Sequence, residues 1–297
     1  MSTPLVTVII NCFNGEAYLR QAIDSVIAQT WTRWEIVFWD NQSSDDSANL
    51  VKSYNDPRIR YFYAPSHTLL YEARNNAIQK ARGSLLAFLD VDDYWLPTKL
   101  ELQVALFSDE DVSLVYGNYW IGHERKKKQW IAYRNRLPAG YILDALLETY
   151  KVGLLTVIVR KNHLPNLKNP FDSRFNIIGD FDLVIRLAAE KKIACVQEPI
   201  ALYRIHEENL SSLQPHRHLA ELQCWISEKS RHKLIKESKN FSRVTESALY
   251  KKATLMLLEG NRKGAFRVLS LMQWSALKIR LFCMSILPRF MLYRLKN

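Results

Sequence analysis

The stretch Leu85-Leu86-Ala87-Phe88-Leu89-Asp90-Val91-Asp92-Asp93 consists of five apolar residues followed by four residues of which three are aspartates. An unbroken apolar run of this length is typical of a strand that is buried on both faces of a sheet. Carboxylates clustered behind it repel one another, and hard oxygen ligands of this kind suit Mg²⁺ or Mn²⁺. The alternative is that Asp92 or Asp93 caps a helix beginning near Tyr94, which explains only one of the three carboxylates.

Apolar strand segments alternate with amphipathic helical segments through the whole first half of the chain. The strands are predicted at residues 5–10, 34–39, 60–63, 85–89 and 112–116, and the helices at 16–29, 43–54, 70–81 and 95–107. Strands of this kind need helices on both faces of their sheet. The order therefore predicts an α/β domain with a mostly parallel central sheet flanked by helices.

Polar side chains recur at one place in this pattern, directly after the strands. Asn11 and Asn14 follow the first strand, Asp40 and Asn41 follow the second, and Asp90 opens the acidic turn after the fourth. In open α/β sheets the carboxyl ends of parallel strands meet at the crevice where ligands bind. We therefore expect these side chains to share one ligand site.

The composition is that of a globular protein, with 48% hydrophobic and 24% charged residues among 297. Its four cysteines stand far apart, which argues against a disulfide framework or a structural zinc site. The amino terminus does not resemble a secretory signal, and no uncharged apolar run approaches the ~20 residues of a membrane span. A cytoplasmic location is the expectation.

The net charge of +11 comes entirely from the C-terminal part of the chain. Residues 216–297 contain 17 Lys and Arg against 5 Asp and Glu, whereas residues 1–215 carry a net charge of −1. The hydrophobic pattern of the same region predicts helices only, at residues 216–237, 243–259, 262–273 and 276–287. We expect a separate basic helical region at 216–297 that meets an acidic surface, either anionic lipid or nucleic acid.

Five blocks make the chain similar to the family 2 glycosyltransferases, whose fold is called GT-A. They are Val6–Gly15, Asp40–Ser47, Ala73–Ser84, Phe175–Leu187 and Tyr203–His206, within a resemblance over roughly residues 4–212. The chain departs from the family pattern at Asn11, where Pro is usual, and at Gly179, which stands where the family has Glu. The resemblance implies a GT-A catalytic domain at 1–215, with a nucleotide-sugar half at about 1–117 and an acceptor half at about 118–215.

The resemblance also implies roles for the side chains after the strands. Asp40 would accept a hydrogen bond from N3–H of uracil, which favours a UDP-sugar donor, and Asn14 would lie in the same donor site. Asp90 would contact the ribose or a metal-bound water, and Arg74 would bind a phosphate or hold the acidic cluster. The alternatives are that Asp40 caps the helix at 43–54 and that Arg74 forms a surface ion pair.

Inverting transfer needs a base that takes the proton of the acceptor hydroxyl as its oxygen attacks C1 opposite the leaving diphosphate. Asp180 is the candidate base, with a pKa expected to be raised by partial burial or by contact with the acceptor, and Asp182 is expected at the start of a helix. Asp92 is the candidate ligand of Mn²⁺ or Mg²⁺. His206 would complete the metal or diphosphate site, and packing as an ordinary polar residue is its alternative.

The expected protein is an inverting glycosyltransferase that moves a sugar to a hydroxyl of a glycan or lipid-linked acceptor. A catalytically inactive binding protein of the same fold is one alternative, and a nucleic-acid-binding protein is another. The turn after the first strand lacks G-x-G-x-x-G, which argues against a nicotinamide enzyme. The basic region lacks evident base-stacking aromatics or a reading helix, so no nucleic-acid partner is expected.

Residues 260–297 predict attachment to a membrane surface. They contain 8 Lys and Arg and no Asp or Glu, interleaved with apolar side chains from Phe266 to Tyr293. Such a segment buries apolar groups at the headgroup boundary while its cations meet lipid phosphates. We expect the protein to lie at the inner face of the cell membrane. Packing of these apolar residues on the catalytic domain or on a second subunit is the alternative.

Overall fold

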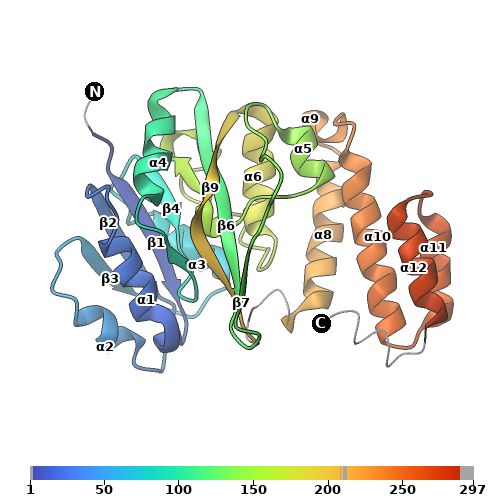
Figure 1. Ribbon diagram of the computed structural model, residues 1–297, viewed down its shortest axis with the longest axis horizontal. Helices are drawn as coiled ribbons and strands as arrows, with labels where there is room; N and C mark the ends of the chain where they lie inside the picture. The colour runs from blue at the N-terminus through green and yellow to red at the C-terminus, as the bar shows by residue number, and fades with distance from the viewer. Residues whose placement is uncertain (1–2, 208, 210–212, 288–297) are drawn as a thin grey trace. The chain divides into compact units, whose positions relative to one another are not determined.

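The computed structural model describes residues 3–207, 209 and 213–287 (Figure 1). By internal packing the chain divides into two compact units. The first is Met1–Ile142 with Tyr150–Glu207, and the second is Leu143–Thr149 with Glu208–Asn297. The described part of the first unit is built on one β-sheet, and that of the second is helical. Several hydrophobic positions predicted for the tail, from Phe290 to Tyr293, lie outside the described residues.

Nine strands within the described residues form the sheet of the first unit. Their bounds are β1 Val6–Cys12, β2 Trp34–Asp40, β3 Ile59–Tyr63, β4 Leu85–Phe88, β5 Tyr94–Trp95, β6 Val112–His123, β7 Lys128–Ile131, β8 Ile158–Arg160 and β9 Lys192–Ile205. The order across the sheet is β3-β2-β1-β4-β8-β6-β9-β5, and β7 pairs with β6. β8 lies antiparallel between β4 and β6, so β1, β2, β3, β4, β6 and β9 all run in one direction. The predicted α/β class with a mostly parallel sheet is confirmed.

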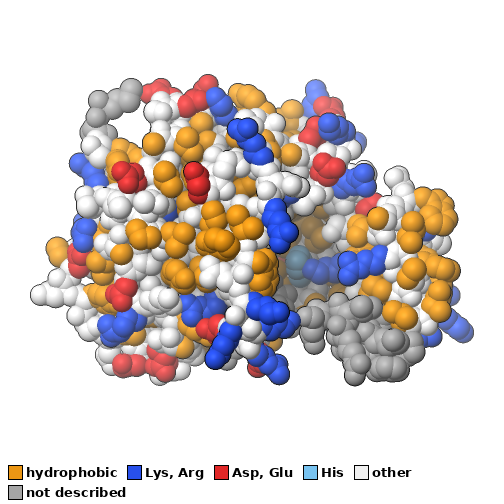
Figure 2. Space-filling model, viewed as in Figure 1, with side chains coloured by type: hydrophobic (Ala, Val, Ile, Leu, Met, Phe, Trp, Pro, Cys, Tyr) orange, Lys and Arg blue, Asp and Glu red, His pale blue; other side chains and the backbone are white. Residues whose placement is uncertain are grey.

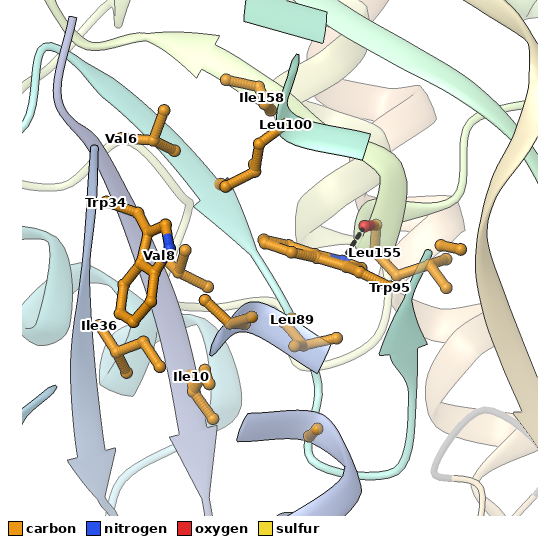
Figure 3. Close-up of a cluster of buried hydrophobic side chains, with 14 of the residues drawn as sticks. Val6, Val8, Ile10, Trp34, Ile36, Leu89, Trp95, Leu100, Leu155 and Ile158 are labelled. Atoms are coloured by element: carbon orange, nitrogen blue, oxygen red, sulfur yellow. Dashed lines mark hydrogen bonds between the residues drawn. The ribbon is translucent and has the colours of Figure 1, made fainter. Parts of the chain in front are cut away.

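Helices α1 Glu16–Ile27 and α4 Lys99–Ala105 bury their apolar faces against one side of this sheet. The side chains of the layer include Val6, Val8, Ile10, Trp34, Ile36, Leu89, Trp95, Leu100, Leu155 and Ile158 (Figure 3). Trp95 lies inside the layer and satisfies its indole N–H by donating to the carbonyl oxygen of Leu155 at 2.8 Å. Because both faces of β1 are buried, its sequence is apolar almost throughout rather than alternating.

Two helices begin later than the sequence predicts. The helix expected at 43–54 is α2 Ser47–Lys52, because residues 43–46 form a turn instead. The helix expected at 95–107 is the shorter α4, since Tyr94 and Trp95 pair antiparallel with β9 as β5. The sequence also predicts a strand near residues 155–160, which is β8, but its apolar runs do not predict β5, β7 or β9.

Helix α3 Leu70–Ile78 is fixed to the segment that leads into α6 Gly179–Glu190. The Nδ2 of Asn75 donates to the carbonyl oxygen of Phe171 at 2.9 Å, and the Phe171 N–H donates back to Oδ1 of Asn75 at 3.0 Å. The Phe171 ring also contacts the rings of Tyr71 and Phe88, with centroids 5.1 and 5.4 Å apart. These contacts hold α3 against β4 and against the residues before α6.

The second unit contains helices from two separate parts of the chain. They are α5 Leu143–Glu148, α8 Pro215–Lys229, α9 Lys233–Lys236, α10 Phe241–Leu258, α11 Arg262–Leu271 and α12 Ala276–Ile286. Leu257 of α10 packs with Val268 of α11 and Leu281 of α12 in a buried cluster. Among the described residues, no helix is both long and apolar enough to cross a bilayer.

Helix α5 joins this unit through hydrogen bonds to the segment between α9 and α10. The Nδ2 of Asn240 donates to the carbonyl oxygen of Asp144 at 2.9 Å, and the Ser238 hydroxyl donates to the Asp144 carboxylate. Leu146 and Leu147 of α5 are buried. The seven residues 143–149 therefore belong with helices that follow some 70 residues later in the chain.

Candidate active site

The acidic turn after β4 lies beside the end of β9. The Nε2 of His206 is 2.9 Å from Oδ2 of Asp92. The Oδ1 of Asp93 accepts from the backbone N–H of Arg204 at 2.9 Å, and Nε of Arg204 donates to the carbonyl oxygen of Asp92 at 2.9 Å. The acidic turn and the Tyr203–His206 block are more than a hundred residues apart in the sequence, yet they form one structure around Asp92.

Burial and the neighbouring carboxylates raise the pKa of Asp92 and of Asp93. Burial raises the pKa of Asp92, the charge of Asp90 raises it further, and the hydrogen bond with His206 opposes the rise. Burial raises the pKa of Asp93 well above its usual range, with added repulsion from Asp92 and Asp90. A site in which carboxylates repel one another favours the uptake of positive charge.

The interpretation of Asp92 or Asp93 as a helix cap is wrong. β5 follows the turn directly, and α4 begins only at Lys99 with Thr98 at its N-cap position. Asp93 instead closes the turn by donating its backbone N–H to the carbonyl oxygen of Asp90 at 3.1 Å.

Arg74 of α3 reaches the same turn. It forms an ion pair with Oδ1 of Asp90, and its own side chain is only 3% exposed while that of Asp90 is 39% exposed. The pair is therefore not the surface ion pair that was the alternative for Arg74. Burial acts to lower the pKa of Arg74, but the charge of Asp90 outweighs it and the pKa is raised. Arg74 holds the first carboxylate of the turn with a permanent positive charge.

Asp180, in the first turn of α6, is held by α3 as well. Its Oδ1 accepts a hydrogen bond from the Tyr71 hydroxyl at 2.9 Å. Burial raises the pKa of Asp180, although the hydrogen bonds from Tyr71 and from the backbone of Phe181 partly offset the rise. A carboxylate with a raised pKa is a better proton acceptor near neutral pH than an ordinary one.

Asp182 differs from Asp180 in its partners. It is buried, and its Oδ2 accepts from Nε of Arg186 at 2.8 Å, one turn further along α6. Arg186 in turn donates to the carbonyl oxygen of Pro170 at 2.6 Å. Asp182 thus ties the start of α6 to the preceding loop, in line with the helix-start position expected for it.

Asp40 and Asn14 lie where β1 and β2 end. Asp40 is fully buried, and its carboxylate accepts from the backbone N–H of Ser43 and from the hydroxyl of Tyr61, each at 2.7 Å. Asn14 has a positive φ of 55°, and its side-chain oxygen accepts from the backbone N–H of Ser44 at 2.8 Å. Asp40 is not the cap of α2, whose N-cap position is Asp46. Both side chains shape the turn between β2 and α2.

Tyr18 and Tyr71 have contacts in this region that no sequence block indicated. The guanidinium of Arg204 lies 4.4 Å from the ring centroid of Tyr18, and both side chains bond Glu124, at 3.0 Å and 2.8 Å. The Tyr18 ring also lies 5.4 Å from the ring of His206. Tyr71 was likewise unassigned, because its contact with Asp180 depends on two helices far apart in sequence. Only the Tyr203–His206 block pointed toward Arg204.

The donor set at this turn limits the kind of metal ion that fits. Among the described residues, no three His, Cys, Asp or Glu side chains converge as a complete cation site. Asp92 and His206 are nevertheless two potential ligands in contact, beside the further carboxylate of Asp90. Mg²⁺ and Mn²⁺ in nucleotide sites are commonly held by one or two protein groups, with phosphate oxygens and waters completing the shell. The residues present fit an ion of that kind.

Comparison with known proteins agrees with this geometry. Residues 7–186 match the family model described as glycosyl transferase family 2. The chain is 30% identical over 214 residues to the Escherichia coli "UDP-Glc:alpha-D-GlcNAc-diphosphoundecaprenol beta-1,3-glucosyltransferase WfgD", covering 71% of this chain and 81% of the relative.

Solved structures share the fold at low sequence identity. Staphylococcus aureus TarS 1–349 in complex with UDP-GlcNAc has a TM-score of 0.67 at 15% identity, covering 99% of this chain and 92% of that one. The mannosyltransferase PcManGT from Pyrobaculum calidifontis, in complex with GDP-Man and Mn²⁺, has a TM-score of 0.60 at 16% identity, covering 95% and 79%. The expected GT-A type fold is confirmed, and the chain is a glycosyltransferase that belongs to glycosyl transferase family 2.

Proposed function

We propose that this glycosyltransferase moves a sugar from a UDP-sugar donor to a hydroxyl of a lipid-linked or other glycan acceptor, with inversion at C1. The observation that carries the proposal is the continuous arrangement from the Asp92–His206 pair through Asp90 and Arg74 to Tyr71 and Asp180. In this proposal the leaving diphosphate lies at the Asp92–His206 end of the arrangement, and the carboxylate base is at the Asp180 end. We assign catalysis to residues 1–215 and a separate role to residues 216–297.

Asp180 is the proposed general base. The acceptor hydroxyl oxygen forms its bond to C1 while the bond from C1 to the diphosphate oxygen breaks and the electron pair leaves with UDP. The hydroxyl proton passes to the Asp180 carboxylate. Burial raises the pKa of Asp180, which improves its basicity, whereas the Asp182 carboxylate is already engaged in the ion pair with Arg186.

The donor site is proposed at the ends of β1, β2 and β4. Asp40 and Asn14 would bind the nucleoside, and Asp90 would contact the ribose. Arg74 would bind a phosphate or hold the Asp90 carboxylate, with which it already forms an ion pair. Two relatives support a UDP-sugar, since the name of WfgD begins with UDP-Glc and TarS 1–349 was solved with UDP-GlcNAc.

Asp92 and His206 are the proposed protein ligands of Mn²⁺ or Mg²⁺. Such an ion, when bound, neutralises negative charge on the diphosphate. The presence of Mn²⁺ in the PcManGT complex supports the assignment. Arg204 holds the turn that carries Asp92, because its Nε donates to the carbonyl oxygen of Asp92 and its backbone N–H donates to Oδ1 of Asp93.

The acceptor is proposed to be reached at an anionic membrane, and WfgD supports this because its name includes a diphosphoundecaprenol substrate. Helices α11 and α12 expose large apolar side chains, which Figure 2 shows gathered over this part of the molecule. They are Phe266, Leu271, Trp274, Leu277, Ile279, Phe282 and Ile286. Residues 262–287 also contain five Lys and Arg and no acidic residue. We call this set the α11–α12 surface and propose it as the membrane-contacting face.

The test of the reaction is turnover of Asp180→Asn. UDP-glucose and UDP-GlcNAc are supplied with α-D-GlcNAc-diphosphoundecaprenol, and UDP release is measured with Mn²⁺ present. We expect a fall in kcat of roughly 10² to 10⁴ with UDP affinity retained, as for loss of a general base. Asp172→Asn, a change in the same segment at a carboxylate paired with Arg174 at 2.6 Å, serves as the matched control. Loss of UDP affinity in Asp180→Asn would place Asp180 in the donor site instead.

A further inference from the structure

Tyr71 occupies an unusual position between the proposed base and the donor side of the site. Its side chain is buried, and its hydroxyl lies 2.9 Å from Oδ1 of Asp180 and 3.3 Å from the carbonyl oxygen of Ile177. The face of its ring lies 5.0 Å from the guanidinium of Arg74, which pairs with Asp90. One residue of α3 therefore contacts the base and also supports the arginine that holds the acidic turn.

The ring of Tyr71 fits at this place only because residue 179 is a glycine. A Cβ built on Gly179 would lie 2.5 Å from Cδ2 of the Tyr71 ring and 2.6 Å from its Cγ. Real Cβ atoms do not approach other heavy atoms so closely, so any larger residue at 179 would displace the ring. Gly179 is also the first residue of α6 and immediately precedes Asp180. Gly179 stands where the family pattern has Glu, and it is the position at which the Tyr71 ring needs space.

We propose that Tyr71 is a positioning residue for Asp180, and that Gly179 is the partner that makes room for it. This inference rests on the proposed function, because it takes Asp180 as the base. The Tyr71 hydroxyl binds Oδ1, which orients the carboxylate and leaves Oδ2 as the oxygen without a side-chain partner among the described residues. The acceptor hydroxyl would then meet Oδ2, and the chain would hold a single orientation of the base before the acceptor arrives.

The charges around Asp180 agree with this role. Tyr71 and Arg74 face it from α3, Asp90 acts on it from the acidic turn, and Tyr150 faces it from the segment after α5. The hydrogen bond from Tyr71 and the charge of Arg74 lower the pKa of Asp180, while burial and the charge of Asp90 raise it. Tyr71 therefore keeps Asp180 ionised at a pH where burial alone would favour its protonated form.

The decisive variant is Tyr71→Phe, which keeps the ring and removes the hydroxyl. We expect kcat with UDP-glucose or UDP-GlcNAc to fall by about 10-fold, equivalent to ~1.4 kcal/mol in the barrier. We also expect the acid limb of the kcat profile to move to higher pH, because loss of the hydroxyl raises the pKa of Asp180. Affinity for UDP should not change. Tyr116→Phe is the matched control, since it deletes another buried hydroxyl, which donates to the carbonyl oxygen of Pro138 at 2.7 Å.

A second pair of variants tests the fit between the ring and the glycine. Gly179→Ala should lower kcat in the native background by pushing the Tyr71 ring away from Asp180. In a Tyr71→Ala background the same change should have no further effect, because the space is already vacant. Additive effects of the two changes would overturn the role of Gly179 as the partner of Tyr71.

The outcomes separate this inference from the proposed function. If Asp180→Asn is inactive while Tyr71→Phe keeps the native kcat and pH profile, the base assignment stands and the positioning role of Tyr71 is wrong. A fall in kcat without movement of the acid limb, matched by Tyr116→Phe, would also overturn it, because that pattern indicates a general structural loss. If Asp180→Asn keeps native turnover, both the proposed base and its positioning residue are wrong.

Discussion

Replacement of Trp274 by Ala should weaken binding of the full chain to anionic vesicles by roughly 50-fold. Trp274 lies between α11 and α12 on the α11–α12 surface and is 83% exposed. The ammonium group of Lys278 lies 5.2 Å from its ring centroid, which places a cation beside the largest apolar side chain of the surface. An amphipathic aromatic ring next to a cation is well suited to the boundary between lipid headgroups and acyl chains.

The magnitude follows from the exposed fraction. A Trp side chain can bury up to ~250 Å², so 83% exposure leaves on the order of 200 Å² available to lipid. At ~25 cal/mol per Å², complete burial would contribute ~5 kcal/mol. A ring at the headgroup boundary loses about half of its water contact, which gives ~2.5 kcal/mol, and each ~1.4 kcal/mol is a factor of ten in affinity.

The assay is sedimentation with vesicles of phosphatidylcholine alone and of phosphatidylcholine mixed with phosphatidylglycerol, at low and at high salt. Tyr141→Ala is the matched control, because Tyr141 is an aromatic residue of the catalytic unit that is 76% exposed. It should leave vesicle binding unchanged. Equal loss in both variants, or a full chain that ignores anionic vesicles at low salt, would refute the reasoning. So would a chain ending near Gly260 that still sediments like the full one.

Two further predictions concern charged groups inside the fold. Asp92→Ala should abolish the part of UDP binding that depends on added Mn²⁺, measured by calorimetry with and without the ion. Full turnover of the native enzyme in excess chelator would contradict a metal role for Asp92 and His206. Lys99 is buried with its ammonium donating to Gln103 at 2.7 Å, and burial lowers its pKa well below 10.5. Between the pKa of Lys99 in the folded protein and 10.5, the unfolded chain binds more protons than the folded one, so the free energy of unfolding rises with pH. Lys99→Met should flatten that rise, measured by urea unfolding at a series of pH values. An equal slope in both proteins would show that Lys99 is not the cause.

The parallel half of the sheet could be predicted because its strands are buried on both faces. Such strands are apolar throughout, as in β4, or almost throughout, as in β1, and polar residues follow them. β9 was not predicted because it is only partly buried, contains Pro199 and pairs with β6 across register shifts. Its sequence has neither a continuous apolar run nor a strict alternation.

The candidate site could be predicted in part for a similar reason. Asp90, Asp92 and Asp180 stand in short motifs, so their residue types indicate their chemistry directly. The contact between Tyr71 and Asp180 could not be predicted, since it joins residues 109 positions apart. It depends on how closely α3 approaches α6, and a single glycine decides that distance. Sequence motifs therefore identify the candidate reacting groups such as Asp180, whereas the residues that position them, such as Tyr71, depend on how the helices pack.

The path of the chain between the two units restricts how they can be recombined. The polypeptide leaves the catalytic unit after Ile142, returns at Tyr150 and leaves again after Glu207. A chain cut after residue 215 would keep α5 but lose α10 and the residues that bond Asp144. Helix α5 would then lose α10 as a packing neighbour. The helical unit therefore cannot be exchanged between transferases through a single fusion point. Any chimera has to exchange residues 143–149 together with the C-terminal helices.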